Sequence, residues 1–466
     1  MVGRIWASGL LVLAGLCLEC RQATGADSLP NVVLIVADDH GWTDYGFMGH
    51  PHIETPQLDK LARRSAVFTR GYVPTALCRP SLATLITGLY AHQHGISGNE
   101  PAPLAEMLKP GGASGNAVEP AEYRALRASM IAQIDTQATL PKLLAAHGYL
   151  SFQAGKWWEG NFRRGGFTEG MTRGFPEQGG RHGDDGLTIG RPSMKPVLDF
   201  VDRCSDQNRP FFLWYAPLLP HQPHDPPDPL FDKYRRKGIE SEHVAKYYAM
   251  VERFDQTCGE LLDHLERRQL ADKTLVIYLA DNGWIQRPDA EGFALRSKQS
   301  ANEGGVRTPI MFSWPGVIAP SVRPEQLCCS TDIFPTILAA AGISDGPTVP
   351  GYDLLPCLRS GQPSPRSRVF GEGFTHDVPD VGDPEAGLLY RWTTDGRWKL
   401  LLTYDAKPDR YASHHPRQPA GPQLFDLLAD PTESRNLATD HPELVRELSD
   451  RLQQWWPVAR RRVLSD

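Results

Sequence analysis

The chain has 466 residues, of which 41% are hydrophobic and 22% are charged, and its formal net charge is -6. This is the composition of a globular protein long enough for one large domain and a smaller one. The mild acidity argues against a general nucleic-acid binder, which would be basic, but it is compatible with a local basic pocket for an anionic ligand.

The N-terminus has the pattern of a secretory signal. Arg4 precedes an apolar stretch over residues 5–18, and a cleavage site is offered by the small residues Ala23, Gly25 and Ala26. The apolar stretch is shorter than a typical transmembrane helix, and no later segment resembles a transmembrane helix. We therefore predict a signal peptide over residues 1–26, a secreted or periplasmic protein, and no stable membrane insertion.

Four short apolar runs, at residues 32–37, 149–154, 211–216 and 274–280, are typical of central strands in a sheet covered on both faces. Helical patterns lie between them, for example at 140–147 and 243–267. Alternating strands and helices predict an α/β architecture, in which sites form beyond the carboxyl ends of strands.

The C-terminal region has a different pattern. Asp395-Gly396 lies between strand-like flanks and predicts a hairpin, and residues 424–427 continue the strand pattern. A final helix is predicted to begin near Pro442, with one apolar face made of Leu444, Val445, Leu448, Leu452, Trp455 and Trp456. We therefore divide the mature chain into a main domain over residues 27–363 and a C-terminal subdomain over residues 364–466.

Six of the eight cysteines lie beyond the predicted signal peptide, and their spacing fits neither a disulfide framework nor a zinc site. Core packing is the expectation for most of them. Cys78 precedes an apolar, helix-like run, and a thiol at a helix N-terminus has a lowered pKa. Taken alone, such a cysteine is most often structural.

Polar residues follow each predicted strand. Hard oxygen ligands that suit Ca²⁺ or Mg²⁺ follow the first and fourth strands, namely Asp38, Asp39, Asp281 and Asn282. On the acidic residues alone, capping and solvated turns explain the pattern about as well. Candidates for handling an oxyanion are Lys156, His221 and Lys298.

Three motifs resemble those of the type I sulfatases, in which a cysteine is oxidised to formylglycine. The first is Cys78-Arg79-Pro80-Ser81 with an apolar stretch ending in Thr87-Gly88. The second is Lys298 followed by Glu303-Gly304-Gly305-Val306-Arg307, and the third is the Pro220-His221-Gln222-Pro223-His224 loop. The resemblance extends from about residue 31 to residue 456.

This resemblance implies an alkaline phosphatase-like fold: a large mixed sheet flanked by helices, with a smaller C-terminal antiparallel sheet and helix. It implies a sulfuric ester hydrolase acting on a sulfated small molecule or glycan, with formylglycine made from Cys78 by the formylglycine-generating enzyme. Calcium, or magnesium, would be held by Asp38, Asp39, Asp281 and Asn282. The implied catalytic residues are Cys78, His221, Lys156 and Lys298, and the implied substrate-binding residues are Lys156, His221, Lys298 and His224.

Two positions depart from the family pattern. Leu82 stands where the family has arginine, and Trp158 stands where it has the histidine of Gly-Lys-Trp-His. Neither side chain can replace a guanidinium fork or an imidazole, and we expect Trp158 to form a wall beside the site. Two alternatives remain. One is a phosphodiester or phosphonate monoester hydrolase on the same scaffold, and the other, which these departures motivate, is a non-catalytic binder of sulfated glycans.

Overall fold

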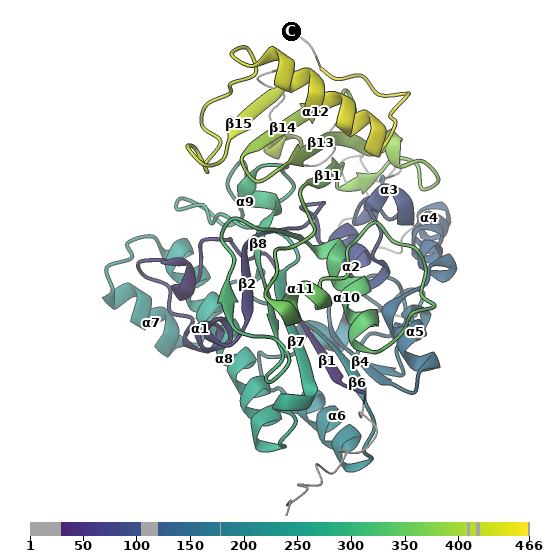
Figure 1. The fold of residues 1–466 in the computed structure, drawn as a ribbon, viewed down its shortest axis with the longest axis vertical. Helices are drawn as coiled ribbons and strands as arrows, with labels where there is room; N and C mark the ends of the chain where they lie inside the picture. The colour runs from purple at the N-terminus through teal and green to yellow at the C-terminus, as the bar shows by residue number, and fades with distance from the viewer. Residues whose placement is uncertain (1–28, 104–119, 178, 408–410, 416–419, 465–466) are drawn as a thin grey trace, which may run out of the picture.

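The computed structural model describes residues 29–103, 120–177, 179–407, 411–415 and 420–464 (Figure 1). The predicted signal peptide over residues 1–26 lies outside the described residues. Within the described ranges, no helix is both long enough and apolar enough to cross a membrane.

A nine-stranded sheet forms the centre of the described structure, in the order β10-β2-β8-β7-β1-β6-β4-β5, with β9 beside β2. Its middle is parallel, because β1 pairs with both β6 and β7, and β6 pairs with β4. These strands span Asn31–Ala37 (β1), Leu150–Gly155 (β4), Phe211–Ala216 (β6) and Thr274–Ala280 (β7). All four strands predicted from the sequence are thus confirmed, within one residue at each end.

The rest of this sheet makes it mixed. β8 (Arg307–Ser313) runs antiparallel to β7, and β2 (Ala66–Tyr72) runs antiparallel to β8. Shorter strands complete the sheet: β5 (Glu169–Gly170), β9 (Ser321–Val322) and β10 (Leu327–Cys329). The expected mixed sheet is therefore confirmed.

Helices cover both faces of the sheet, and β1 shows why its sequence is apolar throughout. Successive side chains of a strand point to opposite faces, so Val32 and Leu34 enter one buried cluster while Val33 and Ile35 enter another. The first cluster includes residues of α2 (Cys78–Thr87), α5 (Leu140–Ala146), α10 (Ile333–Ala340) and α11 (Leu355–Ser360). The second includes residues of α1 (Pro56–Arg63), α6 (Lys195–Asp206) and α8 (Glu242–Arg267).

A second, antiparallel sheet lies at the top of Figure 1 in the order β11-β13-β14-β15. Its strands are β11 (Val369–Phe374), β13 (Leu388–Thr394), β14 (Trp398–Thr403) and β15 (Gln423–Asp426). At the predicted hairpin, Gly396 has φ 95°, and Asp395 Oδ1 accepts hydrogen bonds from the backbone N–H groups of Arg397 (3.0 Å) and Trp398 (2.8 Å). The helix α12 (Pro442–Trp455) packs on this sheet through Leu448 and Leu452.

The remaining described elements are short or peripheral. They are α3 (Ala91–His94), α4 (Ala121–Ala132), α7 (Asp228–Arg236), α9 (Glu303–Val306), β3 (Glu100–Pro101) and β12 (Asp377–Val378). All six cysteines in the described ranges are buried and free of disulfides, and all but Cys78 belong to apolar clusters, which confirms core packing for most of them. The domain boundary at residue 363 stays a prediction.

Candidate active site

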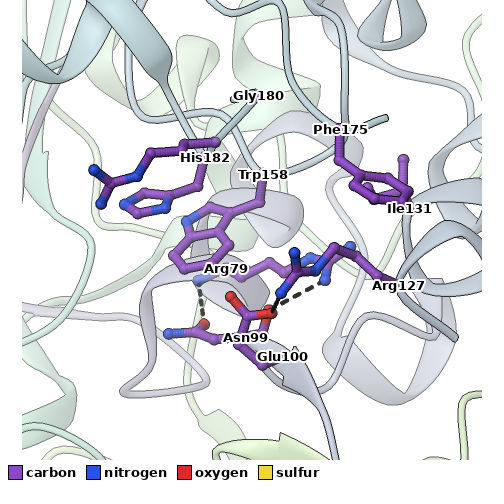
Figure 2. A pocket seen from close by; sticks show the side chains of 10 residues that line it. Arg79, Asn99, Glu100, Arg127, Ile131, Trp158, Phe175, Gly180 and His182 are labelled. Atoms are coloured by element: carbon purple, nitrogen blue, oxygen red, sulfur yellow. Dashed lines mark hydrogen bonds and ion pairs between the residues drawn. The ribbon is translucent and has the colours of Figure 1, made fainter. Parts of the chain in front are cut away.

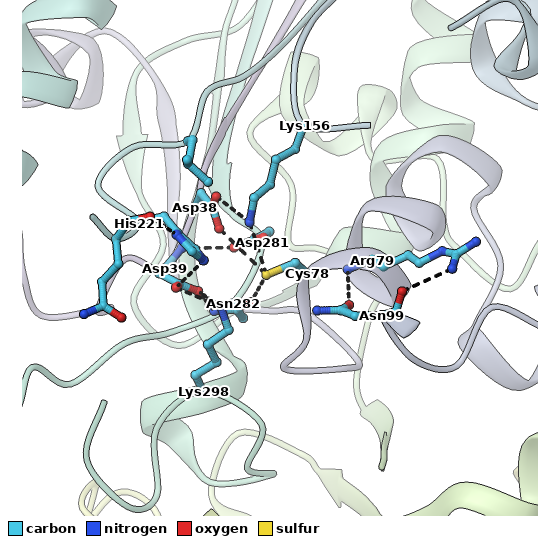
Figure 3. A network of polar contacts seen from close by, with 12 residues as sticks. Asp38, Asp39, Cys78, Arg79, Asn99, Lys156, His221, Asp281, Asn282 and Lys298 are labelled. Atoms are coloured by element: carbon cyan, nitrogen blue, oxygen red, sulfur yellow. Dashed lines mark hydrogen bonds and ion pairs between the residues drawn. The ribbon is translucent and has the colours of Figure 1, made fainter. Parts of the chain in front are cut away.

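The predicted site residues meet at one edge of the large sheet (Figure 3). Asp38 and Asp39 directly follow β1, Lys156 follows β4, and Asp281 and Asn282 follow β7. Because these strands are parallel, their carboxyl ends open on the same side. His221 reaches the same place from the loop after β6, and Lys298 comes from the segment before α9.

Cys78 is brought to this edge by α2, of which it is the first residue. Its thiol is buried, with Sγ 3.4 Å from Lys156 Nζ, 3.6 Å from Asn282 Oδ1 and 3.8 Å from Asp38 Oδ1. The helix ends at Gly88, whose φ of 72° is readily adopted by glycine. The motif thus forms one short helix that points its first side chain into the polar cluster.

Two buried ammonium groups lie against two carboxylates. Lys156 Nζ is 2.6 Å from Asp38 Oδ2, and Lys298 Nζ is 2.6 Å from Asp39 Oδ1. Burial acts to lower the pKa of both lysines, but the neighbouring acidic groups together outweigh it and raise each pKa above its ordinary value. Burial likewise acts to raise the pKa of Asp39, but Lys298, His221 and Lys156 together outweigh it and leave that pKa below its usual range. Both lysines are therefore cationic at neutral pH.

Asp281 lies near Lys156 and Lys298, which act to lower its pKa, but its contacts differ from those of Asp38 and Asp39. Its Oδ1 accepts a 3.2 Å hydrogen bond from the backbone N–H of Asp39, while its Oδ2 is buried with no hydrogen-bond donor among the described residues. Burial, with the neighbouring Asp38 and Asp39, raises the pKa of this carboxyl group well above its ordinary value. A divalent cation would relieve the repulsion and occupy the orphaned oxygen, so these side chains fit a metal ion.

Ligand atoms of Asp38, Asp39, Cys78 and His221 all lie within 4.8 Å of one another, which is compact enough for one ion. Asn282 belongs to the same group, because its Nδ2 donates a 2.7 Å hydrogen bond to Asp39 Oδ1. Asp39 has a φ of 62°, an uncommon conformation for a residue with a side chain. Such strain is typical of functional sites.

His221 presents an unusual contact. Its Nδ1 lies 2.6 Å from the carbonyl oxygen of Gln222, which can only accept, so Nδ1 carries the proton of a neutral ring. Its Nε2 then faces Asp39 Oδ2 at 3.3 Å as a second acceptor. Burial lowers the pKa of His221. The contact therefore calls for a proton or a cation between the two groups.

The position of Cys78 at a helix N-terminus predicts a lowered thiol pKa, and this prediction is wrong. Burial raises the pKa well above its ordinary value, despite the opposing effect of Lys156 and Lys298, and the carboxylates of Asp281 and Asp38 add to the rise. Complete desolvation outweighs the dipole of a short helix. The unmodified residue is thus a neutral thiol at pH 7, and a weak nucleophile.

Three other positions complete the comparison with the sequence. Leu82 is 4% exposed and packs in the apolar core with α5 and α10, so it contributes no polar group. Trp158 lines the cavity as a wall, as expected, and its indole stacks on His182 with ring centroids 4.2 Å apart. His224 packs against Tyr247 and Trp284 and does not line the cavity, so its contact with substrate stays a prediction.

The cavity over Cys78 has a volume of about 410 Å³. Besides the predicted residues, its walls include Asn99, His182, Trp284, Gln299, His376 and Tyr411, which sequence reasoning missed. These residues come from loops and from the C-terminal region, and no motif marks them. Only the folded structure reveals that they share a cavity with Cys78.

Comparisons with known proteins agree with this geometry. The family model described as "Sulfatase" matches residues 30–343, and a model described as "N-sulphoglucosamine sulphohydrolase, C-terminal" matches residues 293–456. The chain belongs to the sulfatase family. It is therefore a sulfuric ester hydrolase, and the resemblance drawn from its motifs is confirmed.

The alignments with known relatives extend over most of this sulfatase. Human "Arylsulfatase A" is 32% identical over 90% of this chain and 86% of its own length. Canine "N-acetylgalactosamine-6-sulfatase" is 29% identical over 84% of this chain and 77% of its own length. The solved structure of the putative sulfatase yidJ from Bacteroides fragilis has a TM-score of 0.69 at 20% identity, covering 93% of this chain and 97% of that one. The alkaline phosphatase-like fold is thus confirmed.

Proposed function

We propose that this sulfatase removes sulfate from a sulfated carbohydrate, using an oxidised Cys78 and a divalent cation. The observation that carries the proposal is the position of Cys78 Sγ, which lies 3.4 Å from Nζ of the cationic Lys156 and 3.8 Å from Oδ1 of Asp38 in the buried polar cluster. The name of the canine relative, an N-acetylgalactosamine-6-sulfatase, supports a sugar sulfate as the substrate class.

Cys78 is proposed as the precursor of formylglycine. A neutral, fully buried thiol is a poor nucleophile, whereas an aldehyde hydrate needs no thiolate. Oxidised in this way, position 78 would supply an oxygen nucleophile for the sulfur atom and a second hydroxyl through which sulfate can leave. Leu82 does not obstruct this role, because its side chain lies in the apolar core.

Lys156 and Lys298 are proposed to bind the sulfate group. Both are cationic and buried, and Lys156 Nζ lies 3.4 Å from Cys78 Sγ. Preorganised charges in a dry site stabilise the negative charge that develops on the ester oxygens. His221 or Lys298 would assist the leaving oxygen, and binding of an anionic substrate would favour the protonated form of His221.

Asp38, Asp39, Asp281 and Asn282 are proposed to hold the cation. Their oxygen donors suit calcium, with magnesium as the second candidate. The bound ion would polarise the nucleophile at position 78 and balance three neighbouring carboxylates. Export after removal of residues 1–26, and maturation by the formylglycine-generating enzyme, belong to the same proposal.

The test is the state of Cys78 in active protein. Mass spectrometry of the Cys78 peptide should find formylglycine in protein from the native host, and turnover of 4-nitrophenyl sulfate should follow the modified fraction. Cys78→Ala should abolish turnover, whereas Cys204→Ala, a buried cysteine far along the chain in α6, should retain it. Sustained sulfate release by protein whose Cys78 is wholly unmodified would overturn the mechanism.

Kinetics on matched esters separate the alternatives. The sulfatase proposal expects higher kcat/KM for an aryl sulfate than for the corresponding phosphonate monoester or phosphodiester. The reverse order would favour the alternative hydrolase on the same scaffold. Tight binding of sulfated sugars by matured protein that has no turnover would favour the glycan binder.

A further inference from the structure

Figure 2 shows a second cavity, which has a volume of about 250 Å³. The two cavities share three lining residues: Asn99, Trp158 and His182. The two cavities are therefore adjacent, separated by these three residues. No predicted catalytic or metal-binding residue lines the second cavity, so it serves a purpose other than breaking the ester bond.

The shared wall is fixed in place. The indole of Trp158 stacks on the imidazole of His182 with an interplanar angle of 15°. Asn99 Oδ1 accepts a 3.1 Å hydrogen bond from the backbone N–H of Arg79, the residue after Cys78. The wall is thus tied to the helix that carries the nucleophile, and its position relative to the reacting sulfate is set before a substrate binds.

Three guanidinium groups line the second cavity, those of Arg79, Arg127 and Arg181, against a single lining carboxylate, that of Glu100. Arg127 Nη2 lies 2.9 Å from Glu100 Oε2, in a partly exposed pair that a ligand can displace at little cost. Arg79 is satisfied by Glu159 behind the cavity.

Arg181 makes no ion pair with any described residue, and its backbone N–H bonds to Asp184. Among the described residues, the lining therefore carries more positive than negative side chains, and two of the arginines, Arg127 and Arg181, are partly or fully exposed. Guanidinium groups match carboxylates and sulfates through two parallel hydrogen bonds. An anionic group fits this cavity better than a neutral one.

We propose that this second cavity is a subsite for an anionic group on the sugar next to the one that carries the scissile sulfate. The inference rests on the proposed function, because it assumes a carbohydrate substrate. The anion is a uronate carboxylate or a second sulfate, and Arg127 and Arg181 bind it. The subsite makes this sulfatase selective for anionic oligosaccharides over single sulfated sugars.

The test uses three disaccharides that share one N-acetylgalactosamine 6-sulfate unit, joined to glucuronate, to neutral galactose or to sulfated galactose. Wild-type enzyme should show higher kcat/KM for an anionic neighbour than for galactose, and the two anionic arms identify which anion is preferred. Arg181→Ala and Arg127→Gln should each lower that preference about tenfold, the effect of losing one charge-assisted hydrogen bond. Arg236→Ala, an exposed arginine at the end of α7, is the matched control and should leave it unchanged.

Calorimetric binding of the unsulfated glucuronate disaccharide tests the subsite without turnover. Wild-type protein should bind it more tightly than Arg181→Ala protein does, and the difference should shrink as salt is added. Equal affinity in both proteins, or equal kcat/KM for all three disaccharides, would overturn the subsite. Failure of matured wild-type enzyme to hydrolyse 4-nitrophenyl sulfate would instead reject the proposed chemistry, and the binding result would still decide the subsite.

Discussion

Replacing Glu159 by glutamine tests whether the buried ion pair between Glu159 and Arg79 fixes the position of Cys78, the proposed nucleophile. Arg79 Nε and Nη2 donate hydrogen bonds of 2.8 and 2.7 Å to the two carboxylate oxygens of Glu159, and both side chains are 3% exposed. Arg79 follows Cys78, and Glu159 lies just beyond Lys156. The pair therefore links the segment of the proposed nucleophile to the segment of a lysine that is proposed to bind sulfate.

The expected cost of Glu159→Gln follows from this burial. Removing one partner of a buried pair leaves the other charge desolvated, which typically costs about 3–5 kcal/mol. The surface pair of Lys195 and Asp199 is closely spaced too, at 2.7 Å, but its side chains are 74% and 43% exposed. Asp199→Asn should cost only about 0–1 kcal/mol, so it is the matched control.

Urea unfolding of the two variants, followed by tryptophan fluorescence, measures the difference. Glu159→Gln should also lower turnover of 4-nitrophenyl sulfate by about 10²-fold under folding conditions, because small displacements of reacting groups cost that much. The double variant Arg79→Met/Glu159→Leu should recover most of the lost stability. A loss of less than about 1 kcal/mol in Glu159→Gln would refute the reasoning.

Three further predictions concern charge. Lys298→Ala should lower turnover about 10²–10³-fold with little change in KM. If steady-state kinetics instead show a raised KM at unchanged turnover, Lys298 only binds the substrate. Asp281→Ala should remain folded but lose activity and calcium-dependent stabilisation in thermal unfolding, and full turnover after metal depletion would contradict the cation's role. Burial raises the pKa of Asp255 from 3.8 to about 7. As pH rises between these two values, Asp255 ionises in the unfolded chain before it ionises in the folded protein, so the free energy of unfolding should fall. Urea unfolding should show that the free energy of unfolding falls by about 3 kcal/mol from pH 5 to pH 8 in the wild type but not in Asp255→Asn. An equal change in the two proteins would contradict this prediction.

The fold was predictable where the pattern was periodic or continuous. The run before Asp38 is apolar at every position because both faces of β1 are covered, and the last helix shows its buried face through Leu448 and Leu452. The polar site was predictable for a related reason, since residues that directly follow parallel strands must meet at one edge. The environment of a single side chain was harder to predict. The thiol pKa of Cys78, for example, depends on its complete burial, which no local sequence pattern reveals.

The walls of the site were not predictable at all, and this has a physical basis. Asn99, His182 and Tyr411 come from separate loops, and each becomes a neighbour of Cys78 only after the chain has folded. The charged residues at strand ends are proposed to carry out sulfate transfer, whereas the wall residues are expected to determine which substrate fits. Trp158 illustrates the difference, because this wall residue departs from the family pattern while the lysines and carboxylates remain. The selectivity of this enzyme should therefore reside in the walls, and its reaction in the strand ends.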